Sequence, residues 1–317
     1  MTTLTTTRLA PSPTGALHLG NARTFLVNWL LAAQRGWRVL MRIEDLDGPR
    51  VKAGSAQQLL DELAWLGLTW EQPVVYQSQR ADMYRQALRH LAEMGAAYPC
   101  VCSRKDIEQA ASAPHAEDGA VTYPGTCRGR FADADAAEAH AGRPAAWRLR
   151  VDGRAVRFRD EFAGDLSLDL AGSGGDFVIF KSDGLAAYQL AVVVDDCAAG
   201  VDAIVRGDDL LDSAGRQIFL RQLLGLGPEP RYWHLPLVTG RDGRRLAKRH
   251  GDTRLAHYRS LGTPPQRIVG LLAHWCGVLD SPAEIDLPDL LKIFDLDRLS
   301  RRPVVFTPAD DAFLTGG

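Results

Sequence analysis

Residues 5–45 read TTTRLAPSPTGALHLGNARTFLVNWLLAAQRGWRVLMRIED. Thr5–Ala10 is typical of a short strand, and proline and glycine punctuate the loop that follows it. Apolar residues then recur at helical spacing up to Ala33, and Val39–Ile43 again favours a strand. This order of elements predicts a βαβ unit with a parallel sheet. Glu44 follows the second strand, so we expect it to face a ligand crevice beyond the carboxyl ends of the strands.

The rest of the chain predicts an insertion between two α/β halves. Helices are expected from Ser55, as the N-cap, to Leu66 and from Asp82 to Met94. Near Pro99, cysteine, proline and glycine replace the periodic pattern, which indicates an insertion. Strands are expected to follow at 147–150, 156–158, 177–180, 190–194 and 203–206, with a helix near 218–224 and mainly helices from 253 to about 300.

The composition is that of an ordinary globular protein. The chain has 317 residues, of which 46% are hydrophobic and 24% charged, and its net charge of -2 neither supports nor excludes a nucleic-acid partner. Five cysteines are too few and too clustered for a secreted disulfide scaffold. No apolar leader opens the sequence, and no apolar run approaches the roughly 18 residues that span a membrane. We therefore expect a cytoplasmic protein with no membrane partner. We also expect a monomer, although no feature of the sequence decides the oligomeric state.

Two common nucleotide-binding fingerprints are missing. The sequence has no G-x-x-x-x-G-K-[ST], and its glycine cluster at 172–175 lacks G-x-G-x-x-G spacing. His18–Asn21 instead lies where a loop becomes a helix N-terminus, and free amides with the helix dipole suit phosphates there. Taken alone, this tetrapeptide fits a helix start with an incidental histidine better than a phosphate site.

A longer series of motifs closely resembles the catalytic domain of class I glutamyl-tRNA synthetases. In chain order, the matching segments are Arg8–Gly15, His18–Asn21, Arg23-Thr24, Asn28–Leu30, Arg42–Asp45, Arg206–Leu211 and Arg245–Arg249. Within that family, Lys181–Asp196 resembles the shortened paralogues that transfer glutamate to queuosine at the wobble position of tRNA(Asp). After the Lys248 loop only about 65 residues remain, which we expect to be too few for an anticodon-binding domain as well as a helical region.

The resemblance implies a Rossmann-like parallel sheet of the class I synthetase type, with a zinc-binding insertion and a helical C-terminal region. The expected division is 1–98 for the first half of the catalytic domain, 99–145 for the zinc-binding insertion, 146–252 for the second half with the lysine loop, and 253–317 for a helical region that contacts the tRNA stem.

The resemblance also implies a glutamate site made by Arg8, Ala10, Ser12, Glu44, Tyr188 and Arg206. The planar guanidinium groups of the two arginines suit the side-chain carboxylate of L-glutamate, and the Tyr188 hydroxyl is a third donor. Glu44 would hold the substrate ammonium. Glutamine would lose the charge-assisted pairing. The ordinary alternatives are a surface ion pair for Arg8 and a half-buried strand tyrosine for Tyr188.

The implied ATP site consists of His18, Gly20, Asn21 and Lys248. His18 and the nearby amides would hold the phosphates, and Lys248 would neutralise the departing pyrophosphate with Mg²⁺, so His18 and Lys248 are the expected catalytic residues. The loop departs from the family pattern, because Arg245 replaces its first lysine and Ala247 replaces its serine. The alternative for Lys248 is a solvated basic turn.

Three cysteines in the insertion predict a structural Zn²⁺ site. Cys100, Cys102 and Cys127 supply soft thiolates in a segment too small for its own core. They leave one ligand short, and the family pattern C-x-C followed by Y-x-x-x-C places Tyr123 there. His115 competes on grounds of softness and abundance. Three unconnected reduced thiols are the alternative.

The expected function is therefore ATP-dependent activation of L-glutamate and transfer of the glutamyl group to queuosine in the anticodon loop of tRNA(Asp). The alternatives are a truncated synthetase that aminoacylates tRNA(Glu) and a noncatalytic RNA-binding paralogue. A zinc hydrolase is excluded, because a C-x-C cluster is typical of a closed structural site. Candidate phosphate contacts, each also typical of a solvated surface charge, are Arg128, Arg130, Arg298, Arg301 and Arg302.

Overall fold

The computed structural model describes residues 4–111, 122–153, 155–244, 246 and 251–316. The predicted βαβ unit is confirmed as β1 (Thr6–Leu9), α1 (Leu19–Arg35) and β2 (Arg38–Ile43). Strands β1 and β2 pair in parallel, and β3 (Glu71–Tyr76) adds in parallel on the other side of β2.

The second α/β half forms a four-stranded sheet in the order β7-β6-β10-β9. Its strands are β6 (Ala155–Asp160), β7 (Gly164–Asp169), β9 (Ala203–Gly207) and β10 (Arg231–Leu235). Strand β10 is parallel to both of its neighbours, whereas β7 is antiparallel to β6. The two sheets meet where the Asp202 amide donates to the Thr6 carbonyl at 3.0 Å, so β9 lies next to β1. Ala10, Glu44 and Gly207, at the carboxyl ends of β1, β2 and β9, line one cavity, so these ends open on the same side.

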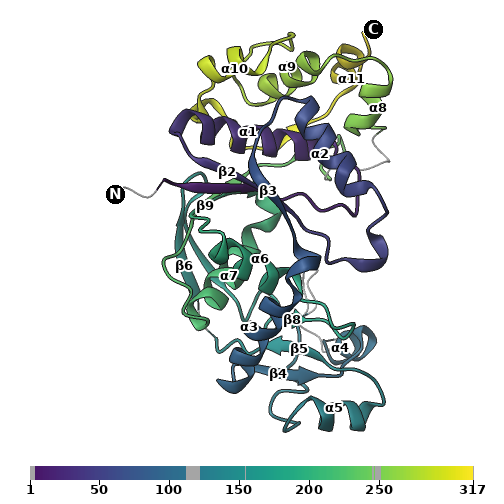
Figure 1. Cartoon of the computed structure of the whole chain (residues 1–317), viewed down its shortest axis with the longest axis vertical. Coiled ribbons are helices and arrows are strands. Elements are labelled where there is room, and N and C mark those ends of the chain that lie inside the picture. Colours follow the sequence, from purple (N-terminus) through teal and green to yellow (C-terminus); the bar gives the residue numbers. More distant parts are fainter. Residues whose placement is uncertain (1–3, 112–121, 154, 245, 247–250, 317) are drawn as a thin grey trace.

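Four longer helices pack around these sheets (Figure 1). They are α2 (Ser55–Trp65), α3 (Ala81–Glu93), α6 (Tyr188–Ala198) and α7 (Leu211–Leu223). The expected N-cap at Ser55 is wrong, because Gly54 is the N-cap and the Ser55 hydroxyl donates to the Lys52 carbonyl at 2.6 Å.

The strand expected at 190–194 is also wrong, because this segment belongs to α6. Every residue from Leu190 to Asp196 is buried, and the helix packs against α3, α7 and β8 (Phe177–Phe180). A continuous apolar run is compatible with a strand or with a helix buried on all sides, and periodicity does not separate the two. Tertiary packing overrides the strand preference of the three valines.

The insertion lies at one end of the molecule, opposite the C-terminal helices (Figure 1). Its core is an antiparallel sheet of β4 (Ala97–Cys100), β5 (Ala146–Leu149) and β8, accompanied by α4 (Arg104–Ala111) and α5 (Ala134–Ala141). The boundary expected between residues 98 and 99 thus falls inside β4.

The C-terminal region packs onto α1 through a shared apolar core that contains Leu26, Leu30, Leu271 and Leu290. It is mainly helical, as expected, and consists of α8 (Leu255–Ser260), α9 (Pro265–Trp275), α10 (Leu287–Ile293), β12 (Val304–Val305) and α11 (Pro308–Thr315). Strand β12 pairs in parallel with β11 (Val238–Thr239). Within the described ranges, no helix combines the length and apolar character needed to cross a membrane.

Candidate functional site

A cavity of about 470 Å³ lies beyond the carboxyl ends of β1, β2 and β9. This is the usual place for a ligand in an open α/β sheet. All predicted glutamate-site residues line it, together with the predicted ATP-site residues that the structure describes, namely Arg8, Ala10, Ser12, His18, Gly20, Asn21, Glu44, Tyr188 and Arg206. Lys248, together with Arg245 and Ala247 of its loop, lies outside the described residues.

One wall of the cavity carries a buried chain of charges. The Arg8 Nε donates to Asp196 at 3.3 Å, and Arg42 donates to the same Asp196 oxygen. Arg42 also donates to Glu44 at 3.0 Å. The side chains of Arg8, Arg42 and Asp196 are 5% exposed or less. Asp196, which does not line the cavity, therefore holds the Arg8 side chain in place at the cavity wall.

The two carboxyl groups in this series of buried charges, those of Asp196 and Glu44, have pKa values shifted in opposite directions. Burial opposes ionisation of Asp196, but the guanidinium groups of Arg42 and Arg8 outweigh it and hold the pKa of Asp196 below its usual value. At Glu44, burial outweighs the attraction of Arg42 and Arg8 and raises the pKa. A cationic ligand group beside Glu44 would favour its ionised form.

Arg206 faces the cavity from the end of β9. Its Nε donates to His234 Nε2 at 2.9 Å, and its other nitrogens donate to Gln217 Oε1 at 2.8 Å, the Leu210 carbonyl at 3.2 Å and the Tyr188 hydroxyl at 3.5 Å. Burial raises the pKa of Tyr188, so this hydroxyl stays protonated and can donate at neutral pH. Arg8, Arg206 and Tyr188 thus present donors that suit a ligand carboxylate.

The N-terminus of α1 forms the other side of the cavity. Helical amides in the first turn, such as those of Gly20 and Asn21, have no preceding turn to bond to, and the helix dipole adds positive potential. A Cβ at Gly20 would lie 3.2 Å from the His18 ring and 3.4 Å from Val238, so the close approach leaves little room for a side chain. This geometry suits an anionic ligand such as a phosphate group.

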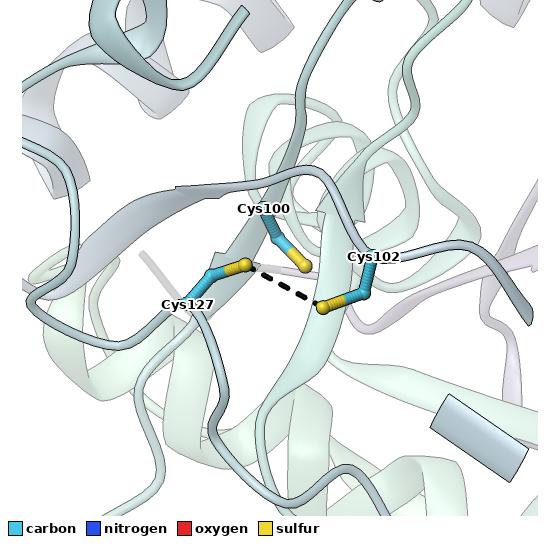
Figure 2. A group of neighbouring side chains, drawn as sticks. All are labelled: Cys100, Cys102 and Cys127. Atoms are coloured by element: carbon cyan, nitrogen blue, oxygen red, sulfur yellow. Dashed lines mark hydrogen bonds between the residues drawn. The ribbon is translucent and has the colours of Figure 1, made fainter. Parts of the chain in front are cut away.

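The three cysteines of the insertion converge, as Figure 2 shows. The sulfur atoms of Cys100, Cys102 and Cys127 lie within 4.8 Å of one another, and those of Cys102 and Cys127 are 3.5 Å apart. The Tyr123 hydroxyl lies 3.4 Å from the Cys100 sulfur and 3.7 Å from that of Cys102. Tetrahedral zinc with ordinary bond lengths separates two sulfurs by about 3.8 Å and a sulfur from an oxygen by about 3.5 Å. The cluster is therefore compatible with a zinc site.

Arg148 adds a positive charge to this cluster. Its guanidinium lies 3.8 Å from the centre of the Tyr123 ring, and its Nε lies 3.3 Å from the Cys100 sulfur. Burial opposes ionisation of Cys100, but contacts with Tyr123, the Cys102 amide and Arg148 outweigh it and lower the Cys100 pKa. Burial raises the pKa of Cys102 to about 12. The competing ligand His115 lies outside the described residues.

The predicted RNA-facing arginines mostly contact the protein itself. Arg128 forms an ion pair with buried Asp176, Arg298 donates to the Val278 carbonyl and Arg301 donates to the Phe162 carbonyl. Arg130 lies against His140, and Arg302 is exposed. All five arginines are exposed, so each can also meet solvent or a ligand.

Sequence reasoning missed the residues behind the two cavity arginines. Asp196 holds Arg8, while His234 and Gln217 hold Arg206. A signal for Asp196 was present, since a pair of acids directly after five apolar residues indicates a buried carboxylate that needs a partner. Nothing comparable marked His234, which lies between apolar residues in a short strand.

The chain matches a family model over most of its length and is similar to named proteins. Residues 5–308 match the family model described as tRNA synthetases class I (E and Q), catalytic domain. A glutamyl-Q tRNA(Asp) synthetase from Symbiobacterium thermophilum is 44% identical over 98% of both chains. Another with the same name, from Nocardia farcinica, is 49% identical over 95% of this chain and 92% of its own.

A solved structure shares the fold. The glutamate tRNA ligase of Elizabethkingia meningosepticum superposes with a TM-score of 0.82 at 24% identity, over 98% of this chain and 69% of that chain. At this identity the likeness shows the fold alone. It confirms the class I synthetase architecture that the motifs predicted.

Proposed function

The chain belongs to the class I tRNA synthetase family of glutamate and glutamine enzymes, and from this premise we propose that it activates L-glutamate with ATP and transfers it to queuosine in tRNA(Asp). One observation carries the proposal. A single cavity joins two buried arginines and Glu44 on one side to the N-terminus of α1 on the other. The cavity thus offers an amino-acid subsite next to a phosphate subsite.

Each end of glutamate has a partner in this proposal. Arg8, Arg206 and Tyr188 bind the side-chain carboxylate, and Glu44 binds the ammonium group. Ala10 and Ser12 complete the wall of the subsite. This leaves the α-carboxylate as the group that attacks the α-phosphorus of ATP, which gives glutamyl-adenylate and pyrophosphate. Glutamine would leave the donors of two arginines without a charged acceptor.

His18, Gly20, Asn21 and Lys248 bind the triphosphate, which enters as its Mg²⁺ complex. Positioned donors and cations stabilise the charge that develops on the phosphate oxygens, which is the main source of catalysis in phosphoryl chemistry. The enzyme needs no covalent intermediate of its own. In the second step an RNA hydroxyl attacks the acyl carbon, and AMP leaves.

The acceptor follows from the relatives. Proteins named glutamyl-Q tRNA(Asp) synthetase match this chain over nearly their whole length. This supports queuosine in the anticodon loop of tRNA(Asp) over aminoacylation of tRNA(Glu). The presence of Arg8, Arg206, Glu44 and Tyr188 around one cavity argues against a noncatalytic RNA-binding paralogue. The protein acts in the cytoplasm, as a monomer. The chain has the four proposed parts, except that the insertion also includes the start of β4, and β5 and β8.

We also propose that the cysteine cluster holds one structural zinc ion, with Tyr123 as the fourth ligand. The Tyr123 oxygen lies 3.4 and 3.7 Å from the sulfurs of Cys100 and Cys102, near the separation of about 3.5 Å expected around tetrahedral zinc, which supports this choice. When bound, the metal supplies a cross-link for a segment whose own apolar core is small.

Zinc analysis tests this site. The purified protein should carry about one zinc per chain, and Cys127→Ser should remove most of it. Tyr123→Phe should weaken zinc binding in competition with a chelator, whereas His115→Ala should not. Cys197→Ser, outside the cluster, is the matched control and should keep the metal. A wild-type protein free of zinc after metal-supplemented purification would contradict the proposal.

Pyrophosphate exchange tests the activation step. Glutamate-dependent exchange of pyrophosphate into ATP should fall about 100-fold in Lys248→Ala, because the cation that neutralises the leaving group is lost. Lys292→Ala, which changes an exposed lysine of α10, should exchange at the wild-type rate. An unchanged rate in Lys248→Ala would refute the role of Lys248, and a wild type without glutamate-dependent exchange would refute activation itself.

A further inference from the structure

Three neighbouring strands each contribute one side chain to a buried relay that ends at Arg206. Asp160 ends β6, His234 lies in β10 and Arg206 lies in β9, and these strands are adjacent in the sheet. Asp160 Oδ2 lies 2.6 Å from His234 Nδ1, and Arg206 Nε lies 2.9 Å from His234 Nε2. Asp160 and His234 are each 1% exposed.

The chemistry of arginine fixes the direction of every hydrogen bond in this relay. A guanidinium group only donates, so His234 Nε2 must accept, and the ring proton must lie on Nδ1. That Nδ1–H then donates to Asp160. Burial lowers the pKa of His234, which agrees with a neutral ring in this position.

Backbone amides hold Asp160 itself in one orientation. The amides of Phe162 and Ala163 donate to Oδ1 at 2.9 and 2.6 Å. The His234 amide donates to both oxygens, at 3.3 Å to Oδ1 and 3.2 Å to Oδ2, and Oδ2 faces the histidine ring. The carboxylate therefore selects the tautomer of His234, and the tautomer selects the hydrogen bond to Arg206.

Neither Asp160 nor His234 lines the cavity, whereas Arg206 does. The relay thus touches the cavity only through Arg206, whose other nitrogens bond to Gln217, Leu210 and Tyr188. Pairing a planar guanidinium with a carboxylate depends on its orientation, since both partners are rigid forks.

We infer that Asp160 and His234 are positioning residues that orient Arg206 toward the side-chain carboxylate of glutamate, and so set the preference for glutamate over glutamine. The inference rests on the proposed function, because it assumes that Arg206 binds that carboxylate. In this inference, Asp160 and His234 affect glutamate binding only through Arg206.

Asp160→Asn tests the tautomer directly. The two backbone amides keep the Asn oxygen at the Oδ1 position, so its NH₂ group faces His234 Nδ1. The ring must then carry its proton on Nε2, where it opposes the Arg206 Nε–H, and the hydrogen bond is lost. We expect the KM for glutamate in pyrophosphate exchange to rise about tenfold, with the KM for ATP changed less than about twofold.

Two substitutions of His234 form a matched pair. His234→Asn keeps a donor near Asp160 but removes the acceptor for Arg206, whereas His234→Gln can keep an amide oxygen near the Nε2 position. His234→Asn should therefore raise the KM for glutamate and reduce the glutamate-to-glutamine preference, and His234→Gln should restore both in part. The thermal unfolding midpoints of all variants show whether a change in KM for glutamate accompanies a loss of stability.

The outcomes separate this inference from the proposed function. A wild type that exchanges pyrophosphate with glutamate, alongside Asp160→Asn and His234→Asn variants with wild-type KM for glutamate, would refute the relay and leave the function intact. Equal increases in the KM values for glutamate and ATP, or no recovery in His234→Gln, would also refute a positioning role. A wild type inactive with glutamate would instead refute the proposed function.

Discussion

Asp196→Ala should lower the free energy of unfolding by about 3–5 kcal/mol, which is the usual cost of removing one partner from a buried ion pair. The substitution leaves Arg8 and Arg42 buried without the carboxylate that both of them contact. It also frees Arg8 from the orientation that directs it to the cavity, so glutamate-dependent exchange should be lost. Denaturant titration measures the first effect, and pyrophosphate exchange the second.

Two further variants make this result specific. Asp196→Asn keeps the shape and an acceptor oxygen, so its loss of stability should be smaller. Asp82→Ala removes a fully exposed carboxylate and should leave the unfolding midpoint unchanged. An Asp196→Ala protein as stable as Asp82→Ala would show that the buried charge chain does not hold this wall of the cavity together.

The same carboxylate predicts a pH dependence. The pKa of Asp196 is lowered in the folded state, so its contribution to stability is present above its unfolded pKa of about 3.9 and is lost as pH falls through the lower folded value. Between pH 5 and lower values, the wild type should therefore lose stability more steeply than Asp196→Asn. Parallel curves for the two proteins would contradict this assignment.

The sequence predicted what is local or carried by a motif. Thr5–Asp45 predicted the βαβ unit, and the predicted glutamate-site residues proved to line one cavity with His18, Gly20 and Asn21. Spacing alone also indicated a metal cluster, and the sulfur atoms of Cys100, Cys102 and Cys127 do converge.

Contacts between side chains far apart in the sequence could not be predicted from local patterns. Arg8 and Asp196 are 188 positions apart, and His234 and Asp160 are 74 apart, so neither pair leaves a spacing pattern. The helix α6 was missed for a related reason. Its valine run is buried on every side by other elements, and only their positions decide between strand and helix.

Dependence on queuosine is the largest effect that the proposed function predicts. If the glutamyl group passes to a hydroxyl of the modified base, a tRNA pool without that base offers no acceptor at all. Aminoacylation of tRNA(Glu) would instead be indifferent to the modification, because its acceptor is the 3′ end. In a tRNA pool without queuosine, transfer to the modified base therefore cannot occur, whereas aminoacylation of tRNA(Glu) can.

The most direct test is transfer of labelled glutamate, with ATP and Mg²⁺, to tRNA pools from matched cells that contain or lack queuosine. Label should appear only in the queuosine-containing pool and should require the wild-type Lys248, while Lys292→Ala labels normally. Equal labelling of both pools would contradict the account in favour of a truncated aminoacylating synthetase, and labelling of neither pool would favour a noncatalytic paralogue.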